Sequence, residues 1–508
     1  MSGYRFLGHL PALALLVSAF LGGCSTRSVD RSLLGLQLTG QPGGGVLLKQ
    51  PGVHQAGYAL LFATRIRSLL RQGRMEQAYH VYRQLYRLQP GDPPEEFLPN
   101  VEAGTLALES GSNGDALKYF SEAEHFLDRW RNRPIVWEKT EKGLKELLGI
   151  AVGLEDMADY VGEPYERILA LNYKSLAYLL EGRREAYNVT RRAINWQNME
   201  ERRFRKKVAE LKKRRVREAP LNPGGRAIFD SVFVKYDIAR ITRIPSAFVN
   251  PLGFYVAGMI QEFDSLQDRS VRDNARISYE KALALNPDNP AFKRLIRRSV
   301  KAMKRRPARN RRLVHLLVAD GFAPEKKVQT ILLDTGYQPL PIILPRYEPV
   351  PSRVRRIEVR VGRKRLATLA PVADVEALVL RHQYDRLPFE QFKVGLIIAR
   401  RVFERGLLHS MQNSLGPYGS LLATPLLAMR ESFTTVDTRN WMSLPKVVYA
   451  TRMELSKRLA AVELVSYDSG GRVVARRRIE LPRGRHCFIY VRSVDQHLEP
   501  YVSEKLWI

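Results

Sequence analysis

The sequence has 508 residues, with 82 Lys and Arg against 52 Asp and Glu, which gives a formal net charge of +30. Hydrophobic residues make up 45% and charged residues 26% of the chain, which is typical of a globular protein and excludes a disordered one. Two cysteines, Cys24 and Cys487, are too few for a disulfide-stapled scaffold, a zinc ribbon or an iron–sulfur protein. The excess of cations predicts an anionic partner, and the compartment of the protein decides which anions it meets.

The N-terminus has the pattern of a secretory signal. Arg5 supplies the positive charge, and residues 10–21 form an apolar run that is too short to span a bilayer. Gly22 and Gly23 precede Cys24, and small residues before a cysteine resemble a bacterial lipobox. The resemblance implies that residues 1–23 are a signal peptide cleaved between Gly23 and Cys24, and that Cys24 carries fatty acyl groups such as palmitate. An ordinary signal peptide with an incidental cysteine is the alternative.

A lipid on Cys24 would place the protein in the bacterial cell envelope. By analogy with enteric bacteria, Ser25 after the cysteine favours the outer membrane, facing the periplasm, because an aspartate there would favour retention in the inner membrane. Nucleic acid is then excluded as a partner, whereas anionic lipid, lipopolysaccharide phosphates and cell-wall carboxylates are available. Cys487, within an apolar stretch predicted to be a strand, is expected to be a buried structural cysteine.

The chain between the predicted anchor and residue 310 divides into a tether and a helical region. Residues 24–55 are rich in glycine and predict a flexible tether. Residues 56–310 predict helices with an internal pattern that resembles tetratricopeptide repeats. Small residues let paired helices cross closely, an aromatic residue fills the groove and a proline closes the unit. We therefore predict a solenoid with insertions, with generic helical hairpins as the alternative. The repeat-packing residues are Gly73, Ala78, Tyr82, Pro90, Gly104, Ala116, Phe120, Ala123, Ala275, Tyr279, Ala282 and Pro287.

Residues 313–508 predict an α+β domain. Strands are expected at 313–318, 354–361, 447–455, 461–467, 473–481 and 486–491, from their alternating or continuous apolar pattern and the turns between them. Prolines between 339 and 351 indicate breaks in regular structure, and a long helical segment is expected at about 372–406. The predicted fold is therefore a multidomain α+β protein, with a helical solenoid followed by an antiparallel β-sandwich-like domain.

Several stretches together carry a family resemblance. They are residues 160–167, 171–178, 275–282, 320–326 and 437–445 with Arg452. Over most of the mature chain they resemble an uncharacterised family of bacterial tetratricopeptide-repeat lipoproteins. The resemblance implies an envelope lipoprotein with a repeat solenoid, a β-rich domain and no established activity, in a setting similar to that of lipoprotein activators of cell-wall synthases.

The most specific part of this resemblance is the run from Asp437 to Pro445. Asp437 and Arg439 can pair or cap a turn, and Trp441 can anchor the loop on the sandwich, so we expect a structural role for the motif. A binding or catalytic role for Asp437 and Arg439 is the alternative. Arg452 follows on the next predicted strand and belongs to the same family motif.

Catalytic motifs are not evident in the sequence. Asp334-Thr-Gly336 matches one half of an aspartic-protease site, but that chemistry needs two such carboxylates and the chain has one copy, so a turn explains it better. The nine histidines show no metal-ligand spacing on a helix face, and no nucleophile elbow occurs. We predict a protein that is not an enzyme and has no cofactor or metal.

The positive charge is concentrated in residues 293–312, which hold 11 Lys and Arg and no acid. The candidate anion-binding residues are Arg297, Arg298, Lys301, Lys304, Arg305 and Arg306. A solvated surface without a ligand is the alternative. We predict a lipid-anchored envelope scaffold or adaptor that binds a protein partner on the concave face of the solenoid. The alternatives are a binder of anionic glycolipid or glycan and, with less support, an enzyme acting on cell-wall or surface polysaccharide.

Overall fold

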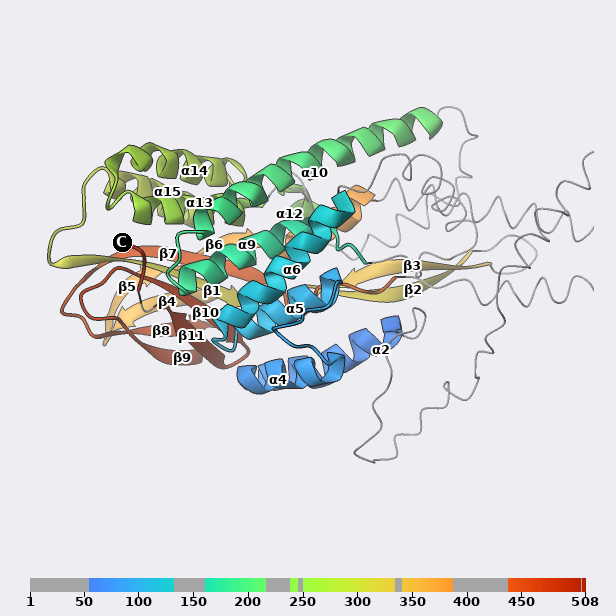
Figure 1. Ribbon diagram of the computed structural model, residues 1–508, viewed down its shortest axis with the longest axis horizontal. Helices are drawn as coiled ribbons and strands as arrows, with labels where there is room; N and C mark the ends of the chain where they lie inside the picture. Colours follow the sequence, from blue (N-terminus) through green and yellow to red (C-terminus); the bar gives the residue numbers. More distant parts are fainter. Residues whose placement is uncertain are drawn as a thin grey trace, which may run out of the picture. The chain divides into compact units, whose positions relative to one another are not determined.

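The computed structural model describes residues 54–131, 160–215, 238–244, 250–333, 340–386, 437–503 and 505–508. All of them belong to one compact unit that comprises residues 48–508. The predicted signal peptide, most of the predicted tether and the Asp334-Thr-Gly336 turn lie outside the described residues. The chain is an α+β protein in which a helical region is followed by β-sheets (Figure 1).

Helices occupy the first half of the described chain. Their bounds are α2 His54–Leu61, η2 Phe62–Ile66, α3 Arg67–Arg71, α4 Met75–Tyr86, α5 Phe97–Leu108, α6 Asn113–Arg131, α9 Pro164–Leu180, α10 Ala186–Arg215, α12 Ile238–Thr242, α13 Pro251–Asp264, η5 Arg269–Val271, α14 Arg272–Ala284 and α15 Pro290–Met303. The longer helices pack in chain order, from α4 on α5 through α6, α9, α10, α13 and α14 to α15. Each of these helices thus contacts its neighbours along the chain.

Strands occupy the second half. Their bounds are β1 Arg311–Asp320, β2 Glu325–Leu333, β3 Leu340–Glu348, β4 Arg356–Val361, β5 Lys364–Thr368, β6 Ala370–Asp374, β7 Val447–Ser456, β8 Ala461–Tyr467, β9 Val473–Glu480, β10 Cys487–Val494 and β11 His497–Val502. They form a five-stranded sheet in the order β11-β10-β1-β7-β6, a four-stranded sheet in the order β5-β4-β8-β9, and a two-stranded ribbon of β2 and β3.

The five-stranded sheet corrects the expectation of an antiparallel sandwich. Strand β1 lies between β10 and β7, and its pairing with β10 is parallel, with Val314 opposite Cys487. A continuous apolar run such as that of β1 is typical of a central strand that is covered on both faces. The first strand of the C-terminal half is therefore its centre.

Alternate residues of β1 belong to two different cores. Val314, Leu316 and Val318 face a core shared with the four-stranded sheet. Leu313 and Leu317 face a core shared with the helices. The five-stranded sheet therefore has helices on one face and a second sheet on the other.

Helices α5, α9 and α13 are buried along almost their whole length. Helices α6, α10 and α14 pack against them, and α9 and α13 also contact strands of the five-stranded sheet. The sequence predicted a concave helical surface open to a protein partner. In the structure, the inner helices are instead covered by the chain's own β-region.

Two local expectations for the C-terminal half are corrected. The helix expected from Val372 is described as residues 375–386, and residues 370–374 before it form strand β6. Residues 340–348 form β3 although two prolines lie within it, because a ribbon of two strands leaves outer edges where a proline costs no ladder hydrogen bond. The continuation of the expected helix to residue 406 lies outside the described residues.

Candidate functional site

Helix α15 has one apolar and one basic face, and its start is well defined. The side chain of Asn289 accepts hydrogen bonds from the backbone N–H groups of Ala291 and Phe292, and Pro290 takes the first helical position, where its missing N–H is not needed. Phe292, Ile296, Ser299 and Met303 recur at helical spacing and are buried. The opposite face of the helix must therefore point to solvent.

The candidate anion-binding residues lie on that outer face and just beyond it. Arg297, Arg298 and Lys301 are exposed on α15, and Lys304, Arg305 and Arg306 are exposed directly after it. The ion pairs of the described residues include none of these six side chains. A group of like charges held on one short segment without a carboxylate creates a positive potential that attracts anions.

The basic segment around β4 and β5 differs, because a carboxylate lies in its middle. Glu358 is buried and forms ion pairs with Arg356 at 3.4 Å, Arg360 at 3.3 Å and Arg365 at 3.3 Å. The charge of this second basic segment is partly neutralised within the protein. Helix α15 and the residues after it therefore form the stronger candidate for binding an anion.

The motif loop, residues 437–445, is packed between the helical and β-regions. The Asp437 carboxylate accepts hydrogen bonds from the backbone N–H of Arg439 at 2.9 Å and from its side-chain Nε at 3.0 Å. The Arg439 guanidinium also lies over the Tyr160 ring, at 5.2 Å from its centre. Pro445 at the end of the loop is buried. The Asp437 carboxylate is thus engaged within the loop itself.

Trp441 is the anchor of the loop, but its environment differs from the one expected. Its ring lies 5.5 Å from the ring of Tyr173 on α9 and 6.3 Å from that of Phe120 on α6. Its indole N–H donates hydrogen bonds to Thr105 Oγ1 and Ser443 Oγ. Trp441 therefore packs among the helices and not on the sandwich.

Buried carboxylates of the inner helices hold the backbone of this loop. Glu102 on α5 accepts hydrogen bonds from the backbone N–H groups of Met442 and Ser443, and Glu166 on α9 accepts one from Trp441 at 2.8 Å. Burial raises the pKa of Glu102 to about 7 and that of Glu166 to about 7, and the hydrogen bonds oppose this rise. Three consecutive backbone donors are thereby satisfied away from water.

Arg452 makes a similar connection at α13. Its Nε lies 2.7 Å from the Glu262 carboxylate, which also accepts a hydrogen bond from Tyr279 and lies 3.1 Å from His315 Nε2. Burial works against ionisation here, but Arg452 and His315 lower the pKa of Glu262 to about 2. Arg452 also pairs with Glu454 at 2.9 Å. The family residue Arg452 thus joins strand β7 to the helices.

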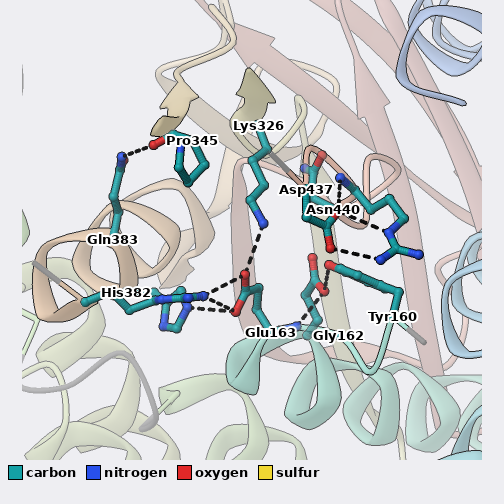
Figure 2. Close-up of polar contacts among 12 residues, drawn as sticks. Tyr160, Gly162, Glu163, Lys326, Pro345, His382, Gln383, Asp437 and Asn440 are labelled. Carbon is teal, nitrogen blue, oxygen red and sulfur yellow. Dashed lines mark hydrogen bonds and ion pairs between the residues drawn. The ribbon is translucent and has the colours of Figure 1, made fainter. Parts of the chain in front are cut away.

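A third cluster surrounds Glu163 at the start of α9 (Figure 2). The Glu163 carboxylate lies 3.2 Å from Lys326 Nζ on β2, 3.0 Å from His382 Nε2 and 3.2 Å from Arg386 Nη1. Burial opposes ionisation of Glu163, but these cations hold its pKa well below the usual value. A carboxylate engaged in this way joins three elements and is a poor general base. The residues 160–163 were singled out by the family resemblance, but their sequence did not indicate these partners.

The predicted repeat-packing residues lie in several kinds of position. Gly104 and Phe120 meet where α5 crosses α6, and a Cβ on Gly104 would lie 3.0 Å from the Phe120 ring. Gly73 does not lie at a helix crossing, because it occupies the turn before α4 with φ +72° and faces His497. Ala78, Tyr82, Ala116, Ala123, Ala275, Tyr279 and Ala282 are buried in their helices, and Pro90 and Pro287 follow the ends of α4 and α14.

In the part of the chain that the structure describes, no group of three or more His, Cys, Asp or Glu side chains could hold a metal ion. Among the same residues, no helix is both long and apolar enough to cross a membrane. Cys487 is buried within β10, where burial raises the pKa of its thiol to about 12. No protein-family model, no curated protein and no solved structure matches this chain.

Proposed function

We propose that this chain is a non-enzymatic lipoprotein of the bacterial envelope that binds the anionic phospholipid headgroups of a membrane through helix α15. The observation that carries the proposal is the set of exposed cations on α15 without an acidic partner. Each Lys or Arg held near an anionic membrane surface contributes about 1 kcal/mol of attraction. Several such residues on one rigid helix would favour one orientation of the protein on the membrane.

The predicted anchor makes this contact geometrically accessible. Acyl groups on Cys24 would hold the protein at the outer membrane, facing the periplasm. A flexible tether of the length of residues 24–55 has an end-to-end distance of about 30 Å. The folded part would then sample the membrane at a high effective concentration, so that weak electrostatic contacts are sufficient.

A fluorescent label after α15 tests the proposal on the lipidated, full-length protein. Ala308 is exposed and can be replaced by cysteine, while Cys487 is buried and Cys24 would be acylated, so the new thiol is the one that reacts. The protein is reconstituted into vesicles of phosphatidylcholine with or without phosphatidylglycerol. We expect the emission of an environment-sensitive dye to shift to the blue only when phosphatidylglycerol is present.

Charge reversal on α15 provides the decisive comparison. The α15 variant combines Arg297→Glu, Arg298→Glu and Lys301→Glu, and it should abolish the dye response. A control variant reverses three exposed cations elsewhere that form no ion pair among the described residues, namely Arg65→Glu, Arg74→Glu and Arg87→Glu. An unchanged response of the α15 variant would contradict the proposal. A response to a soluble anionic glycan but not to phosphatidylglycerol would replace the membrane by a glycan as the partner.

An envelope scaffold or adaptor is the second candidate function. The helices pack in chain order, which supports the finer proposal of a tetratricopeptide-like solenoid at residues 56–310 followed by a β-sandwich-like domain at 313–508. Because the inner helices are covered, a protein partner would contact the outer helices α6, α10 and α14. Photocrosslinkers placed on the exposed faces of these three helices should then capture one defined envelope protein, and none of comparable abundance from α4.

A further inference from the structure

Three turns that are far apart in the sequence meet beyond the end of α15. They are residues 304–311, which lead into β1, residues 456–460, which join β7 to β8, and residues 481–486, which join β9 to β10. The backbone N–H of Lys457 donates to the carbonyl of Asn310 at 2.9 Å, and that of Leu313 donates to His486 Nδ1 at 2.8 Å. We call these three turns together the basic edge.

Arg312 holds the basic edge together from inside. Its side chain is fully buried, and its two terminal nitrogens donate to the backbone carbonyls of Pro482 and Leu459. Among the described residues, Arg312 has no carboxylate partner. A buried guanidinium used in this way fixes the turns of β7–β8 and β9–β10 relative to β1. The side chains that these turns present are therefore held on a common support.

The basic edge presents a dense group of exposed cations. They are Lys304, Arg305, Arg306, Arg309, Arg311, Lys457, Arg458, Arg483 and Arg485. None of them forms an ion pair with a described residue, and the three turns contain no Asp or Glu. The nearest acids along the strands are engaged elsewhere, since Glu454 pairs with Arg452 and Glu480 with Arg478. The positive charge of the edge is therefore not neutralised by its neighbours.

The pKa of a neighbouring histidine reflects this local field. Burial lowers the pKa of His486, and the charge of Lys457 lowers it further. A cation of the turn between β7 and β8 thus acts on a group of the turn between β9 and β10.

The residue types of the edge indicate which anion it fits. Seven of its nine exposed cations are arginines, whose planar guanidinium groups donate two parallel hydrogen bonds to a phosphate. The three turns contain no Phe, Tyr or Trp on which a nucleobase could stack. Charge and residue type therefore favour phosphate groups over nucleobases as the ligand.

We propose that the basic edge is a second part of the membrane contact, in which arginines of the β-turns bind the phosphates of anionic phospholipid headgroups. The inference rests on the proposed function of α15 and extends it to residues that lie more than 150 positions further along the chain. The edge begins where α15 ends, so the two cationic groups are continuous through residues 304–306.

An edge variant tests this inference with the same labelled, lipidated protein. It combines Arg458→Glu, Arg483→Glu and Arg485→Glu, all at exposed positions outside α15. The phosphatidylglycerol content that gives half of the dye response should rise. The equilibrium between the basic edge in contact with the membrane and away from it should shift away from contact on the order of a hundredfold, because three cations near the membrane are reversed. A second variant with Arg→Lys at the same positions should lose much less, because it keeps the charge and lacks only the fork.

The variant at Arg65, Arg74 and Arg87 is the matched control, since it changes the net charge by the same amount. Its residues flank α3 and α4. Gly73 between these helices faces His497, the first residue of β11, which lies opposite Val494 at the far end of β10. The eight residues of β10 separate that end from the basic edge by about 26 Å. This control should respond like the parent protein, and circular dichroism should show that all variants are folded.

The outcomes separate the two proposals. Loss of the response in the α15 variant together with an unchanged edge variant would overturn the inference and leave the proposed function intact. Loss in the edge variant with an unchanged α15 variant would support the edge and refute the proposed role of α15. If neither variant differs from the control, both proposals fail. Competition by inorganic phosphate as effective as that by phosphatidylglycerol vesicles would assign the edge to free phosphate and refute the membrane contact.

Discussion

Replacing Trp441 by alanine should destabilise the protein severely, because this side chain lies among the helices in the core that they share with the five-stranded sheet. It is 0% exposed and packs against the rings of Tyr173 and Phe120. Truncation of a fully buried aromatic residue to alanine costs about 3–5 kcal/mol, through lost burial and the cavity that remains. We expect Trp441→Ala to lower the free energy of unfolding by an amount in this range.

A second substitution divides this cost into two parts. Trp441→Phe keeps a ring in the core but removes the indole N–H, which donates hydrogen bonds to Thr105 Oγ1 and Ser443 Oγ. The Thr105 hydroxyl still donates to the Val101 carbonyl, so the loss should be close to that of one buried hydrogen bond, about 1 kcal/mol, plus the cost of the smaller ring. Trp441→Phe should therefore lie between the parent protein and Trp441→Ala.

Urea unfolding followed by far-ultraviolet circular dichroism measures these differences. Leu60→Ala is the control, because Leu60 is 64% exposed on α2 and its truncation should change stability by less than about 0.5 kcal/mol. One core contains residues of both regions, so the signals of helices and strands should shift together. A cost below about 1 kcal/mol for Trp441→Ala, or loss of the strands alone, would refute the view that Trp441 joins one shared core.

Three further predictions concern other parts of the chain. Gly258→Ala should cost about 1–3 kcal/mol in urea unfolding, because a Cβ there would lie 2.7 Å from the Tyr279 ring, and an unchanged midpoint would contradict this packing. Glu262 has a pKa lowered from 4.5 to about 2, so its contribution of about 3 kcal/mol is present above pH 4.5 and is lost as the pH falls towards 2. Glu262→Gln should remove that part of the acid dependence, and an identical pH profile would argue against the pair with Arg452. Cys24→Ala should release the protein from membranes in cell fractionation, and continued membrane association would refute the lipid anchor.

Local patterns predicted β1, β4, β7, β8, β9 and β10, but not β3, β5, β6 or β11, and the pairing of the strands was not accessible. The apolar run of β1 and the alternation in β7 identify strands by themselves. The parallel pairing of β1 with β10 joins residues such as Val314 and Cys487, which are separated by most of the C-terminal half. No short-range signal encodes such a contact, because register depends on which faces become buried in the assembled sheet.

Glycine and proline were the least reliable guides. Gly73 fits a repeat spacing, yet it serves a turn with a positive φ, where any side chain would be strained and would meet His497. The prolines of β3 suggested an irregular segment, but they lie in a two-stranded ribbon. In both cases the residue type was consistent with two structures, and tertiary contacts decided between them.

The buried carboxylates of the inner helices were missed, although the sequence carries a signal for them. Glu102 lies within a mostly apolar stretch of α5, and Glu262 follows the apolar residues 252–260 of α13. An isolated glutamate on a helix that is apolar all round must be buried, and a buried carboxylate needs donors. The pattern can therefore predict that such a helix faces hydrogen-bond donors, but not that Met442, Ser443 and Arg452 supply them.

The same carboxylates help to explain why the positive charge is so concentrated outside. Four buried carboxylates accept hydrogen bonds from the chain's own β-region, namely those of Glu102, Glu109, Glu166 and Glu262. They are therefore not available to neutralise cations at the surface. Acids that hold the two regions together are thereby withdrawn from the exterior. The exposed cations of α15 and of the basic edge consequently meet solvent without partners, and their binding to an anionic surface should weaken steeply as salt screens it.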